Sequence, residues 1–186
     1  MANIYNKKRR RNFLLKLRPV FRWVLKLRSS SYAIAGGLGL GMFLAFTPTV
    51  GIQIILAVVL ATLLNVNRPA AMIPVWITNP VTVAPIYTFN YWLGLKFVDG
   101  PPLSEVSSLF IEVGKTMTRL EFWDIDELFM SIIDMGRDIL VPLLVGSLVI
   151  GLVTGIATYL GSLKLLKAFL NRRASKRILN SPGPRK

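Results

Sequence analysis

The sequence predicts an all-α integral membrane protein. We expect a helical bundle with two proline-broken membrane segments, re-entrant or discontinuous, one further transmembrane helix, and an amphipathic N-terminal interfacial helix. The first observation is composition: the 186 residues are 53% hydrophobic with a mean hydropathy of +0.52, which is typical of a membrane protein with one domain. The second is a pair of long uncharged stretches interrupted by proline. The third is the segregation of charge along the chain.

Charge divides the chain into three parts. Residues 1–98 carry twelve basic and no acidic side chains, residues 99–138 carry all nine acidic ones, and residues 139–186 carry eight basic and no acidic ones. Because basic flanks of membrane segments stay in the cytoplasm, we expect both termini there. We therefore predict a basic interfacial segment (1–30), a membrane domain (31–163) with an external acidic amphipathic region (99–138), and a basic disordered tail (164–186).

In the first segment, apolar residues recur at helical spacing and basic residues line another face. This pattern predicts a helix lying in the cytoplasmic interface, where each basic group near an anionic leaflet contributes about 1 kcal/mol. Basic runs with aromatic residues also suit nucleic acid, but beside a hydrophobic segment we expect no nucleic-acid partner. The candidate membrane-surface residues are Lys16, Arg18, Arg22, Trp23, Lys26 and Arg28.

The first membrane stretch, Ser31–Leu64, has no charge and is broken by the sequence Thr47–Gln53. Lipid offers no water to the backbone groups that proline and glycine leave unpaired, so protein must bury such a break or line a wet cavity with it. Each apolar flank is shorter than the roughly 20 residues that a crossing needs. We expect a re-entrant hairpin that leaves Arg28 and Arg68 on one side; a single span kinked at Pro48 is the alternative.

A second apolar stretch runs to Leu95 and is broken by Pro74, Pro80 and Pro85. Two broken segments in succession are typical of the paired discontinuous helices with which transporters build sites at the membrane midplane. We expect polar groups from both breaks to meet. The candidate substrate-binding residues are Thr47, Pro48, Thr49, Gly51, Gln53, Arg68, Thr78, Asn79, Pro80, Thr82, Pro85 and Tyr87.

Beyond these stretches the sequence predicts amphipathic helices in the acidic region, one of them starting at Asp124, and a last membrane helix over residues 139–163. Small residues at helical spacing in the membrane segments predict close helix packing. That packing can lie within one chain or between two copies, so a homo-oligomer is possible. The candidate packing residues are Gly37, Gly41, Ser147, Gly151 and Gly155.

The composition also narrows the chemistry. The chain has no cysteine and no histidine, which removes thiolate metal sites, cysteine nucleophiles and the usual general base. The acidic side chains of the external region fit a helix cap and a solvated face better than a cation site. We therefore expect no enzyme activity, no catalytic residue, no metal and no cofactor. Proton coupling in the core is not expected, because residues 1–98 contain no carboxylate.

The residues Phe46–Gln53, Asn67–Pro69, Thr78–Thr82 and Pro85–Tyr87 resemble the bacterial membrane family known as domain of unknown function 2062. The resemblance spans roughly residues 32–160, and the acidic region 99–138 is less typical of it. It implies an inner-membrane location and no established activity. Some relatives look fused to glycosyltransferases that use polyprenyl phosphates, which points toward lipid-linked substrates. The family's motif falls on Pro48, Gly51, Gln53, Asn79, Pro80, Thr82, Pro85 and Tyr87.

Two classes of function follow from these patterns. The first is facilitated movement or other handling of an anionic lipid or lipid-linked phosphate at the paired breaks, with membrane lipids as the partners. The second is a non-transporting membrane adaptor or assembly factor whose broken helices satisfy each other's backbones, and whose acidic region docks a partner protein.

Overall fold

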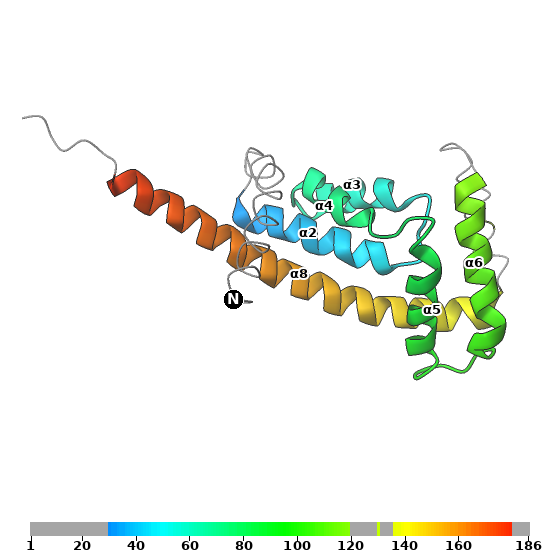
Figure 1. Cartoon of the computed structure of the whole chain (residues 1–186). Helices are drawn as coiled ribbons and strands as arrows, with labels where there is room; N and C mark the ends of the chain where they lie inside the picture. The colour runs from blue at the N-terminus through cyan, green and yellow to red at the C-terminus, as the bar shows by residue number, and fades with distance from the viewer. Residues whose placement is uncertain (1–29, 120–129, 131–135, 180–186) are drawn as a thin grey trace, which may run out of the picture. The chain divides into compact units, whose positions relative to one another are not determined.

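The computed structural model describes residues 30–119, 130 and 136–179 of the chain. The predicted all-α class is confirmed for these residues, which contain no strand (Figure 1). The expected interfacial helix within residues 1–30 and the helix expected from Asp124 lie outside the described residues. The helices are α2 (Ser31–Phe46), α3 (Gln53–Leu63), α4 (Arg68–Val75), α5 (Val83–Gly94), α6 (Leu103–Arg119) and α8 (Arg137–Leu179).

Helices α2, α3 and α4 pack side by side, with α3 antiparallel to the other two. After the break that follows α2, helix α3 returns the chain to the start of α2, where the Asn67 N–H donates to Ala33 O at 2.9 Å. Helix α4 then runs beside α2 in the same direction, because Gly37 lies against Asn67 and Gly41 lies against Ala71 and Pro74. The stretch Ser31–Leu64 is therefore a helical hairpin and not one kinked helix (Figure 1).

Helix α8 is the long element on which α2 and α5 pack. It runs antiparallel to α2: Gly151 lies against Phe43, Gly155 lies against Gly39, and Lys167 reaches Tyr32. The close approach of Gly39 and Gly155 leaves no room for side chains, since a Cβ on Gly39 would lie 2.9 Å from the Gly155 carbonyl oxygen. Gly151 and Gly155 of α8 thus contact α2 of the same chain.

The disordered tail predicted from residue 164 is wrong for residues 164–179, which continue α8. The prediction of disorder rested on the high positive charge of this stretch. Its composition explains the helix: Leu, Lys, Ala and Arg are strong helix formers, and no proline or glycine occurs between Gly161 and Pro182.

Helices α5 and α6 form an antiparallel pair beside the first part of α8. The ring of Phe110 on α6 lies 5.9 Å from the rings of both Tyr87 and Tyr91, in edge-on arrangements. Close backbone contact joins the pair to α8, where Gly94 lies against Pro142 and Gly146 against Asn90. The core of this region consists of Val50, Val83, Tyr87, Tyr91, Val106, Phe110, Val113 and Leu143.

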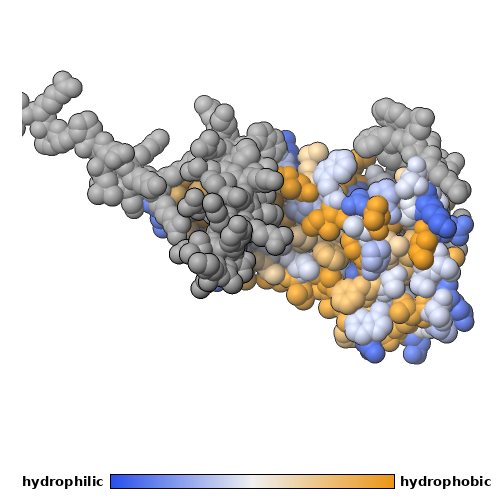
Figure 2. Space-filling view, in the orientation of Figure 1, coloured by the Kyte–Doolittle hydropathy of each residue, from blue (hydrophilic) through white to orange (hydrophobic). Residues whose placement is uncertain are grey.

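Helix α8 is also the one helix among the described residues that is long and apolar enough to cross a membrane, over Arg137–Asn171. Its face away from α2 carries a row of exposed apolar side chains. In Figure 2, hydrophobic side chains reach the surface over much of the fold, and hydrophilic ones lie along the edge formed by α6. The exposed apolar residues on α8 include Leu144, Leu148, Leu152, Val153, Ile156 and Leu160.

Candidate functional site: the paired helix breaks

The first break is a tight turn between α2 and α3. The N–H of Ile52 donates to Thr49 O at 3.2 Å, and Gly51 between them has φ 90°. A positive φ at the third position of a turn is open to glycine at no steric cost. The hydroxyls of Thr47 and Thr49 lie 3.1 Å apart, and Pro48 is buried between them. The motif around Gly51 thus reverses the chain.

The second break is a capped helix start. Asn79 Oδ1 accepts hydrogen bonds from the N–H groups of Val81 (3.0 Å) and Thr82 (3.2 Å), and Thr82 Oγ1 accepts one from the Asn79 N–H at 2.9 Å. This reciprocal pattern is that of a capping box, one turn ahead of Val83, where α5 begins. Pro80 follows Asn79, where a missing N–H costs little. The Asn-Pro-Val-Thr sequence therefore starts α5.

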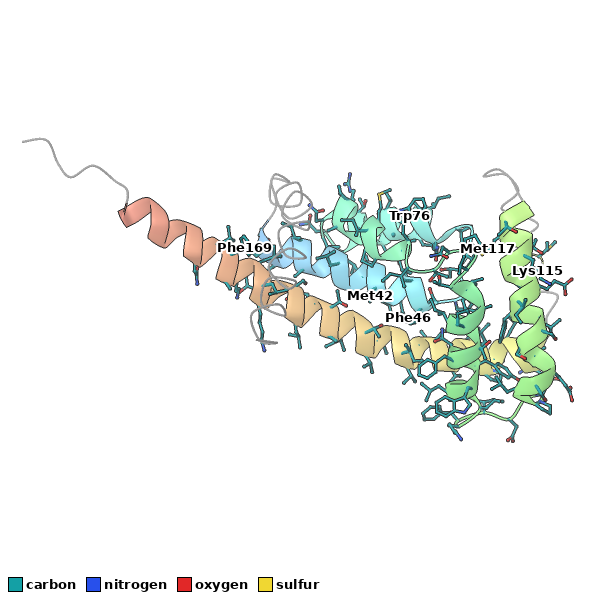
Figure 3. The ribbon with its side chains drawn as sticks, in the orientation of Figure 1. Met42, Phe46, Trp76, Lys115, Met117 and Phe169 are labelled. Atoms are coloured by element: carbon teal, nitrogen blue, oxygen red, sulfur yellow. The ribbon has the colours of Figure 1, made fainter. Side chains whose placement is uncertain are left out.

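The end of α2 shows how the two breaks meet. The last carbonyl groups of a helix have no partner within the helix. Here three consecutive ones each accept a side-chain hydrogen bond: Leu44 O from Thr47 Oγ1 at 2.8 Å, Ala45 O from Thr78 Oγ1, and Phe46 O from Asn90 Nδ2 at 2.8 Å. These donors come from the first break, the second break and α5. We call these three hydrogen bonds the α2 cap. Phe46, the last residue of α2, is labelled in Figure 3.

Gln53 hydrogen-bonds to the carbonyl groups at the end of α4, as the α2 cap does at the end of α2. Its Nε2 lies 3.4 Å from Val75 O and 3.5 Å from Thr78 O, and it donates to both. Val75 is the last residue of α4, so the first residue of α3 caps the end of α4. Gln53 of the first break therefore donates to carbonyl groups beside the second break, and Thr78 of the second break donates to the end of α2 beside the first. Both side chains are buried.

Asn90 is a member of this polar network that the sequence analysis did not single out. It is fully buried, and its Nδ2 donates to Ser147 Oγ on α8 at 2.9 Å as well as to Phe46 O. It therefore joins α2, α5 and α8 at one point. The signal for it was present in the sequence: an asparagine within an apolar helix needs a partner. Ser147 was identified as a small packing residue, and here it also accepts this hydrogen bond.

Three of the predicted residues do not join the breaks' polar network. Arg68 is exposed at the start of α4, about 12 Å of helix rise from the end of that helix, after which Thr78 follows. Pro85 is exposed on the first turn of α5. Tyr87 is fully buried in the α5–α6 core, with its hydroxyl facing the backbone of Val50 outside hydrogen-bond geometry.

The chemistry of the paired breaks is that of neutral hydrogen bonding. In the described part of the chain, three buried side-chain polar atoms have no hydrogen-bond partner: Gln53 Oε1, Asn90 Oδ1 and Tyr87 Oη. The two amide oxygens can only accept, so they suit a donor such as water better than a phosphate. The same described ranges contain no group of three or more His, Cys, Asp or Glu side chains placed to hold a metal ion.

Comparison with known proteins gives the family. No curated protein and no solved structure matches the chain. Residues 15–175 match the family described as "Uncharacterized protein conserved in bacteria (DUF2062)". This match covers most of the chain, and it includes both breaks and the whole of α2 to α6. The chain belongs to this uncharacterised bacterial family.

Proposed function

We propose that the protein is a non-transporting adaptor or assembly factor of the bacterial inner membrane, with both termini in the cytoplasm. The observation that carries the proposal is the α2 cap together with Gln53. The polar side chains of Thr47, Thr78 and Gln53 donate to carbonyl oxygens at the ends of α2 and α4. A transport site instead needs such groups directed at a substrate.

The charges along α8 support a membrane placement. The 25 residues between Asp138 and Lys164 carry no charge, and at about 1.5 Å per residue they span about 38 Å. That length covers a hydrocarbon core of about 30 Å with some tilt. Helix α2 lies along this part of α8, with Tyr32 beside Lys167 and Phe46 O sharing Asn90 with Ser147.

This placement puts the two breaks inside the hydrocarbon layer. Ser147 lies nine residues after Asp138, about 14 Å along the helix. At that depth an unpaired carbonyl costs several kcal/mol, which explains why three side chains converge on the end of α2. The α2–α3 hairpin then enters and leaves on the basic side, as a re-entrant segment.

The surface that fits a partner lies on the α5–α6 pair, at the acidic end of α8. An open groove of about 520 Å³ runs between the two helices. Its walls are mostly apolar, while the exposed side of α6 carries Glu105 and Glu112, followed by Lys115. We infer that the occupant is an amphipathic helix of a partner protein with basic residues along its flank. The groove is lined by Ala84, Pro85, Thr88, Phe89, Trp92, Leu103, Ser107 and Ile111.

Two neighbouring serines of α6 provide a matched test. Ser107 lines the groove, whereas Ser108 is exposed and bonds to Glu105 O at 2.9 Å. Ser107→Asp places a charge in the apolar groove and is expected to weaken partner binding at least tenfold, since burying an unpaired charge is costly. Ser108→Asp is expected to leave binding within about twofold.

The measurement is stoichiometric co-purification of a partner with the full-length chain after gentle solubilisation, followed by titration of that partner. Equal binding by the Ser107→Asp and Ser108→Asp variants would overturn the groove as the docking surface. Retention of phospholipid instead of protein in the groove would identify a lipid-binding face.

Lipid movement is the second candidate, and one observation favours it. Gln53 Oε1, Asn90 Oδ1 and Tyr87 Oη are buried without partners around the breaks, and water bound there would begin a polar path. If this candidate holds, the reconstituted protein accelerates the flip of labelled phosphatidylglycerol in vesicles, and Gln53→Ala abolishes that acceleration while the protein still folds. Vesicles with and without the protein showing equal flip rates would exclude it.

A further inference from the structure

At the basic end of the bundle, one contact ties α2 to α8. The ammonium of Lys167 donates to the Tyr32 hydroxyl at 2.8 Å, and it lies 4.4 Å from the centre of the Tyr32 ring. Tyr32 is 56% exposed, so the pair lies on the surface. We call it the Tyr32–Lys167 pair.

The pair presents two hydrogen-bond donors side by side. An ammonium has three N–H groups, and only one of them is directed at the tyrosine oxygen. That oxygen accepts the bond and keeps its own proton to donate. The cation–π contact holds the lysine in place, so less side-chain freedom is lost when an anion binds. Adjacent charged and neutral donors suit a phosphate group, which accepts several hydrogen bonds at once.

The surroundings of the pair are positive. Arg68 begins α4 at this end, since the N–H of its neighbour Asn67 bonds to Ala33, the residue after Tyr32. Lys164 is exposed one turn before Lys167 on α8. The acidic residues of the described ranges (Asp99, Glu105, Glu112 and Asp138) lie just before α6, on α6 or at the opposite end of α8.

Apolar surface adjoins this positive end. Leu63 at the end of α3 and Leu64 directly after it are 74% and 62% exposed, and Leu165 on α8 is 58% exposed. A cationic site at the border of an exposed apolar surface fits an amphiphile, with its phosphate at the cations and its acyl chains along the leucines. A free phosphate would gain nothing from the leucines.

We propose that the Tyr32–Lys167 pair, with Arg68 nearby, is a binding site for the phosphate headgroup of an anionic phospholipid. The site rests on the proposed membrane placement, which sets this end of α8 at the level of the headgroups. It is separate from the paired breaks, whose hydrogen bonds among the described residues involve no positive side chain.

The test uses the full chain in detergent micelles and short-chain phosphatidylglycerol as the probe. Lys167→Gln removes the charge and is expected to weaken binding about tenfold, and Tyr32→Phe keeps the ring but removes the hydroxyl, weakening it about threefold. The matched control is Lys96→Gln. Lys96 also sits over an aromatic ring, that of Trp92 at 5.3 Å, but on the other end of the bundle, and its loss is expected to change binding less than about twofold.

Equal affinities for the Lys167→Gln and Lys96→Gln variants would overturn the site. So would equal binding of phosphatidylcholine, or displacement of the lipid by an equal concentration of inorganic phosphate, which would show that the acyl chains contribute nothing. Carbonate extraction of the same proteins from membranes distinguishes a failure of the lipid site from a failure of the proposed membrane placement. If the wild type stays in the membrane and only Lys167→Gln loses phosphatidylglycerol, the site is supported; if the wild type is extracted, the placement on which it rests fails.

Discussion

Replacing Gly146 by alanine is expected to separate α5 from α8 and to leave little folded protein. A Cβ at this position would lie 1.8 Å from Asn90 O and 2.8 Å from the Gly94 nitrogen. Both are backbone atoms, so no side-chain rotation relieves the overlap, and the helices must move apart. Overpacking commonly costs about 1–3 kcal/mol. We expect a loss of about 3 kcal/mol or more, because the shift also breaks the hydrogen bonds of Asn90.

The same helix offers the control for this prediction. Gly161 lies in α8 with no atom within 4 Å of a Cβ built on it. Gly161→Ala is expected to keep or raise stability, since alanine is favoured over glycine inside a helix by about 1 kcal/mol. Thermal unfolding in detergent, followed by the fraction of monodisperse protein after heating, compares the two variants. Equal melting temperatures would contradict the close contact of α5 and α8.

Replacing Asn90 by leucine is expected to destabilise the protein by about 2–4 kcal/mol, although leucine keeps much of the volume and is more apolar. The variant removes the donor to Phe46 O and to Ser147 Oγ. The Phe46 carbonyl would then end α2 without its side-chain partner. A buried group left unpaired in this way carries its full desolvation cost.

An exposed hydroxyl serves as the comparison for Asn90→Leu. Thr62 on α3 is exposed, and its Oγ1 donates to Val58 O at 2.7 Å. Thr62→Val is expected to change the free energy of unfolding by less than about 0.5 kcal/mol. If Asn90→Leu proved as stable as Thr62→Val, the α2 cap would contribute nothing to the fold, and a binding role for Asn90 would be favoured.

The sequence was sufficient to predict the helix breaks, because the chemistry that makes them is local. Gly51 permits the positive φ of the turn, and Asn79, Pro80 and Thr82 make a capping box within four residues. Such signals act over a few positions and need no knowledge of the rest of the fold. The apolar stripe of α6 was predictable for the same reason, as Val106 and Val113 are both buried.

The partners of the polar side chains were not predictable from the sequence. Gln53 reaches Val75, Thr78 reaches Ala45, and Asn90 reaches Phe46, which lies 44 positions away. These pairings depend on how the helices are placed, and periodicity within one segment contains no information about that. Arg68 was predicted to be the positive substrate-binding residue at the cytoplasmic end, and the direction of α4 puts it at the opposite end of the bundle from the breaks.

The end of α8 was mispredicted for a different reason. Basic residues after Lys164 indicated a solvated tail, and charge was given more weight than helix propensity. A long helix that is already formed can continue through a charged stretch, because adding a residue to it costs far less than nucleating a new helix. Composition alone does not show whether such a stretch begins a helix or extends one.

We propose above all that the paired breaks form an internally bonded, dry core within the membrane. Single-cysteine labelling tests this most directly, because the native chain has no cysteine. Thr49 and Thr82 are only partly buried, so a cysteine at either position would react with the label if water reached the breaks. Ser108 is exposed on α6. We expect Thr49→Cys and Thr82→Cys to resist a membrane-impermeant maleimide from both sides, and Ser108→Cys to react from outside. Labelling at Thr49→Cys or Thr82→Cys from either side would contradict the dry core and favour a hydrated transport path.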